Sequence, residues 1–159
     1  MKQKLPTYGI GPVYGAAVIA LTAAAVFCRK LPVFAPGRLT VLRIPLIVAG
    51  ILLILTGIFM WIHANFISRI DDGISNCRLI TTGIYAWVRN PIYSAIMTAC
   101  TGVILMTGNV FFFVLPFIYW LLMTVLLKAT EEKWLREIFG KEYEDYCKQV
   151  NRCIPWKRK

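Results

Sequence analysis

The chain has 159 residues, of which 58% are apolar or aromatic and only 16% are charged, against about 25% charged in a typical soluble domain. A chain this short leaves much of its surface exposed, so its apolar residues must face something other than water. The net charge of +10 would suit nucleic acid, but the basic residues lie between and after long apolar blocks, where membrane topology places them. These numbers exclude an ordinary soluble domain and argue against nucleic acid as a partner.

The first two apolar blocks run over about Tyr8–Cys28 and Ile44–Ile62, and a loop with Pro32, Pro36 and Gly37 separates them. Each block is long enough to cross about 30 Å of hydrocarbon as an α-helix. The first block is too long for the apolar part of a typical signal peptide, and no convincing cleavage site follows it. We therefore expect it to remain as a membrane anchor.

The third and fourth apolar blocks run over Ile92–Met106 and Val110–Leu127, with only three residues between them. This spacing predicts a tight helical hairpin. Because the third block is short, we expect it to begin a few residues earlier or to end where protein, not lipid, covers it. The prediction for the whole chain is an all-α, polytopic membrane protein with four transmembrane helices.

Small residues at four-residue spacing occur in two of these blocks, as Gly11 with Gly15 and as Ala95 with Ala99. Such pairs let membrane helices approach each other closely. We expect both pairs to serve helix packing.

A polar tail follows the fourth block and carries apolar residues at helical spacing over Ala129–Val150, with Gly140 as a break between two short helices. This pattern predicts a C-terminal amphipathic helical segment. Its apolar stripe would lie on the membrane surface, pack on the ends of the third and fourth spans, or do both.

Lysine and arginine are distributed unequally between the two predicted membrane faces. With both termini inside, the outer face holds four basic residues, Arg29, Lys30, Arg38 and Arg43, and the inner face holds the rest of the 18 together with all eight acidic residues. The positive-inside rule then favours cytoplasmic N- and C-termini. We expect a multi-pass protein of the cell (inner) membrane, in contact with the lipid bilayer.

Two clusters flank the predicted hairpin: Thr82–Tyr93 at its entry and Thr130–Leu135 at its exit. Each residue in them also fits an ordinary interfacial role. Taken together, carboxylates suit an ammonium group, a guanidinium suits a carboxylate, and aromatic faces suit a sulfonium or a base. Since a tight hairpin brings its two ends together, we expect four side chains to converge at one membrane face: Arg89, Tyr93, Glu131 and Glu132.

The strings GIYAWVRNPIY, TEEKWL and FGKEYEDYCKQVNRCIPW occur in this order, with the hydrophobic hairpin between the first two. In this order they resemble the isoprenylcysteine carboxyl methyltransferase family, whose related families include phospholipid N-methyltransferases. The similarity covers roughly residues 78–156. It implies a two-span membrane region at 1–77 and a catalytic region at 78–159, which uses S-adenosylmethionine and no metal.

The resemblance also implies roles for individual residues. The Arg-His-Pro-x-Tyr motif of the family falls on residues 89–93, and its acidic pair falls on residues 131 and 132. Arg89 would be catalytic by orienting the acceptor, and Arg152 is a weaker candidate on the cofactor side. The implied cofactor-binding residues are Tyr85, Val88, Asn90, Pro91, Tyr93, Glu131 and Glu132.

Asn90 departs from the family motif, because histidine is usual at that position. An amide donates a hydrogen bond but cannot carry the proton or the charge of an imidazole. Cofactor binding would survive this change more easily than a role in proton transfer. His63, at the end of the second block, is expected to be interfacial, although the predicted topology places it on the side of the site.

The favoured acceptor is a lipophilic one, a membrane lipid or a prenylated small molecule or protein, as in protein-S-isoprenylcysteine carboxyl O-methyltransferases. Three alternatives remain open at this point: a phospholipid or amine N-methyltransferase, an NADPH-dependent enzyme similar to sterol reductases, and a non-catalytic membrane scaffold. The acidic pair argues against the reductase, since a phosphate-rich cofactor favours more lysine and arginine around its pocket.

Overall fold

The structure is a computed structural model that describes residues 9–67 and 78–156. No strand occurs in these two segments, which hold α1 (Gly11–Cys28), η1 (Pro32–Gly37), α2 (Arg43–Ile62), η2 (His63–Ile67), η3 (Gly83–Ala86), α4 (Pro91–Met106), η4 (Val110–Val114), α5 (Leu115–Ala129), α6 (Glu131–Phe139) and α7 (Lys141–Gln149). The all-helical prediction is therefore confirmed for this part of the chain. The expected start of the first block at Tyr8 and the charges at 2, 4, 69, 71 and 72 lie outside the described residues.

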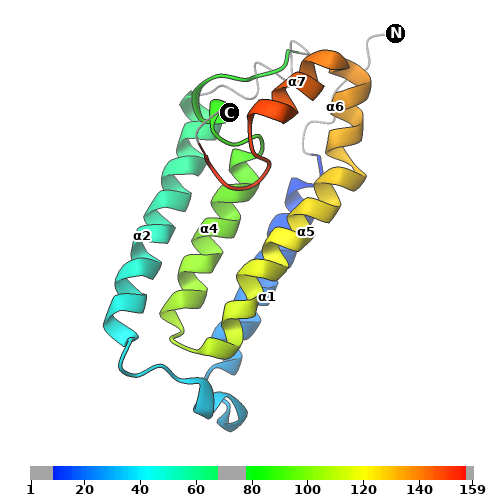
Figure 1. Ribbon diagram of the computed structural model, residues 1–159. Coiled ribbons are helices and arrows are strands. Elements are labelled where there is room, and N and C mark those ends of the chain that lie inside the picture. Colours follow the sequence, from blue (N-terminus) through cyan, green and yellow to red (C-terminus); the bar gives the residue numbers. More distant parts are fainter. Residues whose placement is uncertain (1–8, 68–77, 157–159) are drawn as a thin grey trace.

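Three helical segments of the described chain are long and apolar enough to cross a membrane: Gly11–Cys28, Arg43–Ile67 and Val110–Phe139. Helix α4 is apolar but has only 16 residues. Figure 1 shows α1, α2, α4 and α5 alongside one another, with α6 and α7 at one end and η1 at the other. The architecture is that of an integral membrane protein, and a fourth span depends on how α4 lies in the bilayer.

Helix α4 begins at Pro91, one residue before the predicted block. Of the two expected alternatives, the start a few residues earlier is wrong, and the other is an end that protein covers. Proline suits the first turn because its missing N–H has no partner there in any case. The chain just before α4 lies beside the C-terminal segment, and Arg89 N donates a hydrogen bond to Asn151 O at 2.8 Å. Protein thus covers this end of α4.

The fourth predicted block is divided by Pro116. Residues Val110–Val114 form a 3-10 turn, and α5 proper begins only at Leu115. In an α-helix the N–H of residue 116 would donate to the carbonyl of Phe112, but Pro116 has no N–H. Leu115 N donates to that carbonyl instead, with the tighter spacing of a 3-10 helix. The helix is accordingly shorter than the apolar run.

The most extensive helix contact in the described chain joins α2 and α4. Glycine permits it: a Cβ atom on Gly57 would lie 2.7 Å from the Ala95 carbonyl oxygen and 3.0 Å from Ala99 Cβ. The predicted packing role of the Ala95 and Ala99 pair is confirmed. Gly11 and Gly15 face α4 at ordinary contact distance, so this pair also serves packing.

Gly140 separates α6 from α7 with φ of +51°, as the sequence pattern predicts. Beyond it, Tyr143, Tyr146 and Val150 are buried, with Leu79 and Leu135 packed against them. The Tyr146 hydroxyl donates to the Tyr85 carbonyl at 2.6 Å. The tail therefore packs on the chain that leads into α4. The expected positions on the membrane surface and on the ends of the two spans stay predictions.

Candidate active site

Glu132, the second residue of α6, is the centre of a buried charge cluster. Its carboxylate accepts hydrogen bonds from Nε and Nη2 of Arg152, the second at 3.1 Å. Arg89 Nη1 lies 3.4 Å from Oε1, and Arg136 Nη2 lies 3.9 Å from Oε2. The two-point contact with Arg152 is the geometry in which a guanidinium binds a carboxylate most strongly, and the bond to Glu132 raises the pKa of Arg152.

The charges in this cluster do not balance. The side chains of Arg89, Arg152 and Arg136 are 8%, 21% and 56% exposed, whereas that of Glu132 is 3% exposed. Arg136 is screened by solvent, so two guanidiniums share one carboxylate in the buried part. The buried Nε of Arg89 makes no hydrogen bond to the described residues. Among the described residues, this cluster therefore has one more buried guanidinium than carboxylate, and the Nε of Arg89 is buried without a hydrogen bond.

Glu131 lies next to Glu132 in sequence but has different partners. Its Oε1 accepts hydrogen bonds from the Tyr93 hydroxyl and, at 2.9 Å, from Ile10 N. A Cβ atom on Gly9 would overlap this carboxylate, so the close approach of α1 requires glycine there. The carboxylate of Glu131 thus joins the start of α1, the start of α4 and α6.

The C-terminal segment Val150–Trp156 forms one side of the cluster. It runs beside residues 87–90, where Trp156 N donates to Trp87 O at 3.2 Å and Asn90 Nδ2 donates to Arg152 O at 3.1 Å. Ser94 Oγ donates to Cys153 O at 2.5 Å. These bonds hold Arg152 against Glu132.

The structure brings the four predicted convergent residues together in two contacts, Arg89 with Glu132 and Tyr93 with Glu131. Tyr85 and Val88 are buried in a different apolar cluster, with Met60 and Ala64. Pro91 is buried at the start of α4. These three residues support the loop that carries Arg89. His63 packs edge-on against Phe59 in the turn after α2.

Sequence reasoning gave Arg152 a minor place and omitted Cys147, whose Sγ accepts a hydrogen bond from Arg89 Nη1. Both residues lie in the string FGKEYEDYCKQVNRCIPW, which carries the family resemblance. That string was the available signal, but only the fold shows which of its side chains face Glu132.

A profile of the phospholipid methyltransferase family matches residues 41–142, which is more than half of the chain and extends from the residues just before α2 into α7. The helices apolar enough to cross a membrane agree with an integral membrane protein, and the family match assigns the chain to the methyltransferase class. The chain belongs to the phospholipid methyltransferase family, whose members are membrane methyltransferases of lipid-like acceptors. No curated protein and no solved structure matches it.

Proposed function

We propose that this protein transfers a methyl group from S-adenosylmethionine to a lipophilic acceptor at the membrane interface. The observation that carries this proposal is the excess positive charge of the buried cluster of Arg89, Glu132 and Arg152. The proposal includes four spans, with α4 and α5 as a hairpin, cytoplasmic termini, and a catalytic region over residues 78–159.

The side chains of the cluster fit the chemistry of the cofactor. S-adenosylmethionine carries a carboxylate, an ammonium group and a sulfonium, and the free Nε of Arg89 with the guanidinium of Arg152 suits an anion. Trp87, 54% exposed beside these residues in the chain, offers an aromatic face for a cation or a base. When bound, the cofactor supplies a methyl group that is already activated, so the protein mainly has to align the reactants.

The two neighbouring glutamates have different roles in this proposal. Glu131 binds the ammonium or ribose of the cofactor, because its present partners are a neutral hydroxyl and a backbone N–H. Glu132 is already paired with buried guanidiniums and so positions Arg89 and Arg152. Arg89 orients the anionic part of the acceptor or of the cofactor.

The remaining predicted cofactor residues shape the pocket around these charges. Tyr93 fixes the Glu131 carboxylate, and Asn90 holds the C-terminal segment through the carbonyl of Arg152. Tyr85, Val88 and Pro91 support the Arg89 loop from the buried side. Asn90 takes no part in proton transfer, since an amide does not titrate.

Two acceptor classes fit the site. The sequence resemblance favours the carboxylate of a prenylated cysteine, whose charge Arg89 would bind. The family match favours the amine of a phospholipid headgroup, and Asn90 in place of histidine agrees with an acceptor that differs from that of the isoprenylcysteine enzymes. A phospholipid also presents an anionic phosphate to the same guanidinium.

Calorimetry on the detergent-purified protein tests the cofactor. We expect S-adenosylmethionine to bind, NADPH not to bind, and both Glu131→Ala and Arg89→Ala to weaken the binding at least tenfold, as loss of a charged hydrogen bond does. Exposed Glu137, on the same helix, supplies the control Glu137→Ala, which should bind as the parent does. Binding of NADPH alone would contradict the methyltransferase and favour a reductase. Binding of neither cofactor would contradict both enzymes and favour a non-catalytic membrane scaffold.

Transfer of a labelled methyl group then distinguishes the acceptors. A farnesylated cysteine and phosphatidylethanolamine are offered separately to the protein in the same detergent. Label in a base-labile ester identifies the carboxylate acceptor, and label in a base-stable headgroup identifies the amine acceptor. No label in either lipid would contradict the proposed reaction.

A further inference from the structure

A second charged feature lies at the opposite end of the helices from Glu132. It is a cavity of about 310 Å³ formed where α1 ends, where α2 begins and where α4 ends. This volume is within the range of small-ligand pockets. Six of the residues that line it are Arg29, Lys30, Arg38, Arg43, Met106 and Thr107.

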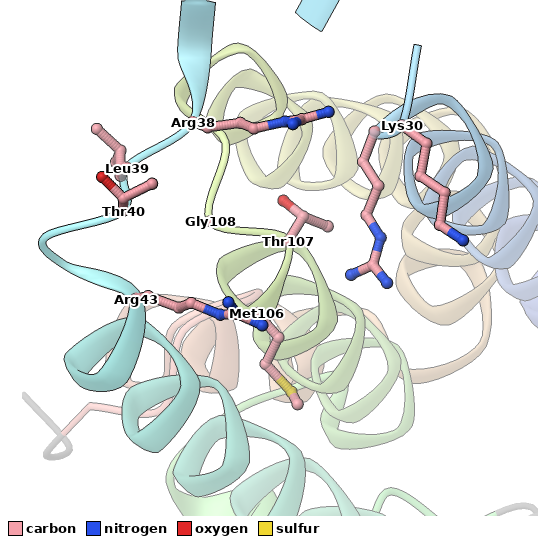
Figure 2. A pocket seen from close by; sticks show the side chains of 9 residues that line it. Lys30, Arg38, Leu39, Thr40, Arg43, Met106, Thr107 and Gly108 are labelled. Carbon is pink, nitrogen blue, oxygen red and sulfur yellow. The ribbon is translucent and has the colours of Figure 1, made fainter. Parts of the chain in front are cut away.

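Four of these lining residues are cationic, and no carboxylate lies near them in the chain. All the acidic side chains of the described residues belong to α6 and α7, at the other end of the molecule. Figure 2 shows the side chains of Arg38 and Arg43 on opposite sides of Thr107. The cavity therefore carries a concentrated positive potential that no acidic side chain of the described residues neutralises.

Helix dipoles account for only part of this charge. Arg29 and Lys30 directly follow the last residue of α1, where a cation is favourable. Arg43 is the first residue of α2, where the positive end of the dipole disfavours a cation, whereas Arg38 directly follows the last residue of η1 in the loop before α2. Neither arginine forms an ion pair with another described residue, which points to an anion from outside the described chain.

The surroundings of the cavity indicate where that anion comes from. The helices that reach it are the apolar ones, so it lies at the level where a hydrocarbon core gives way to water. Exposed apolar side chains flank it, with Val41 93%, Ile44 76% and Phe27 80% exposed. A group bound by the arginines would thus continue into acyl chains that contact these side chains.

Two hydrogen bonds join the loops that border the cavity. Leu39 N donates to Gly108 O at 2.8 Å, and Asn109 Nδ2 donates to Phe34 O at 2.7 Å. Gly108 has φ of +62°, a conformation that suits glycine. The connection between α1 and α2, which carries Arg38, is thereby attached to the turn after α4.

We propose that this cavity binds the phosphate of an anionic phospholipid in the membrane leaflet opposite the candidate active site. Arg38 and Arg43 bind the phosphate oxygens, Arg29 and Lys30 add to the positive potential, and the acyl chains lie along the start of α2. The site stabilises the connection between α1 and α2 and is independent of the methyl-transfer reaction.

Titration of short-chain phosphatidylglycerol into the protein in neutral detergent tests this site, with the thermal unfolding midpoint as the readout. We expect saturable stabilisation by phosphatidylglycerol and little by phosphatidylcholine. Arg38→Gln with Arg43→Gln should weaken the effect about tenfold or more, since each basic residue near an anionic lipid surface contributes about 1 kcal/mol. Arg38→Gln alone, in a loop, should weaken it about fivefold and guards against misfolding of the double variant.

The matched control is Lys128→Gln with Lys141→Gln, which removes two exposed charges from the other end of the molecule. This control should bind phosphatidylglycerol as the parent does. If the control variant lost as much stabilisation by phosphatidylglycerol as the Arg38 and Arg43 variant, the effect would depend on net charge alone. If inorganic phosphate stabilised the protein equally at the same concentrations, no lipid would be needed. Unchanged lipid binding in both Arg38 variants would overturn the proposal.

Discussion

The Nη1 atom of Arg89 lies 3.4 Å from the Oε1 atom of Glu132, and both side chains are almost fully buried. Arg89 belongs to the loop before α4, and Glu132 to the first turn of α6. Arg152, from the C-terminal segment, binds the same carboxylate. One acidic side chain thus connects three parts of the chain, and its charge offsets part of the repulsion between the two guanidiniums.

Glu132→Gln should destabilise the fold. The substitution leaves buried Arg89 and partly buried Arg152 without a counter-charge, and removing one member of a buried ion pair costs about 3 to 5 kcal/mol. Because Arg152 is partly exposed, we expect a loss of about 2 to 4 kcal/mol in the free energy of unfolding. Denaturant unfolding in detergent, followed by circular dichroism, measures it. Glu137→Gln, on the exposed side of α6, should change it by less than about 0.5 kcal/mol; equal losses would contradict the central role of Glu132.

Tyr93→Phe should separate cofactor binding from stability. It removes the hydroxyl that fixes the Glu131 carboxylate, whereas Tyr146→Phe removes a hydroxyl bound to the Tyr85 carbonyl. Each substitution should cost about 1 to 2 kcal/mol of unfolding free energy, the usual value for a buried hydrogen bond. Only Tyr93→Phe should also weaken S-adenosylmethionine binding, which calorimetry on both variants measures. Equal affinities in the two variants would argue against a cofactor role for Glu131.

Most of the helical architecture is predictable from the sequence because apolar runs and glycine breaks are local signals. The predicted blocks and the helices agree closely at α1 and α2, and Gly140 ends α6 as expected. Helix α5 is shorter than the fourth apolar block because Pro116 cannot donate a hydrogen bond to the Phe112 carbonyl. Hydropathy does not show such a backbone effect.

The candidate site was less predictable, for a physical reason. A hairpin argument places Arg89 and Tyr93 near Glu131 and Glu132, but it does not tell which carboxylate meets which partner. That choice depends on the C-terminal segment, whose pairing with residues 87–90 brings Arg152 to Glu132. Such pairing has no periodicity in sequence. The hydrogen bond from Ile10 N to the Glu131 carboxylate likewise depends on the close approach of α1.

Asn90→His should introduce a pH dependence that the parent protein lacks at this position. Histidine can still donate to the Arg152 carbonyl, so the affinity for S-adenosylmethionine should change less than about threefold, a free-energy difference of under 1 kcal/mol. An imidazole with an ordinary pKa near 6.5 would add a charge next to Arg89 as the pH falls. Methyl transfer by the variant should therefore change relative to the parent between about pH 6 and 7. Identical pH profiles would show that residue 90 is remote from the reacting groups.

Gly102→Ala tests the α2–α4 contact on which the position of the site depends. A Cβ atom on Gly102 would lie 2.5 Å from the Gly50 carbonyl oxygen and 3.1 Å from the backbone nitrogen of Ile54, and neither backbone atom can give way without moving α2. Overpacking of this kind costs about 1 to 3 kcal/mol, which should appear as a lower unfolding midpoint in detergent. Gly15→Ala is the matched control, because its Cβ atom would meet only Ile96 Cδ1, at 3.5 Å. The control should leave the midpoint unchanged or raise it, since alanine stabilises a helix relative to glycine by up to about 1 kcal/mol. Equal behaviour of the two variants would mean that α2 and α4 do not approach each other as closely as the glycines allow.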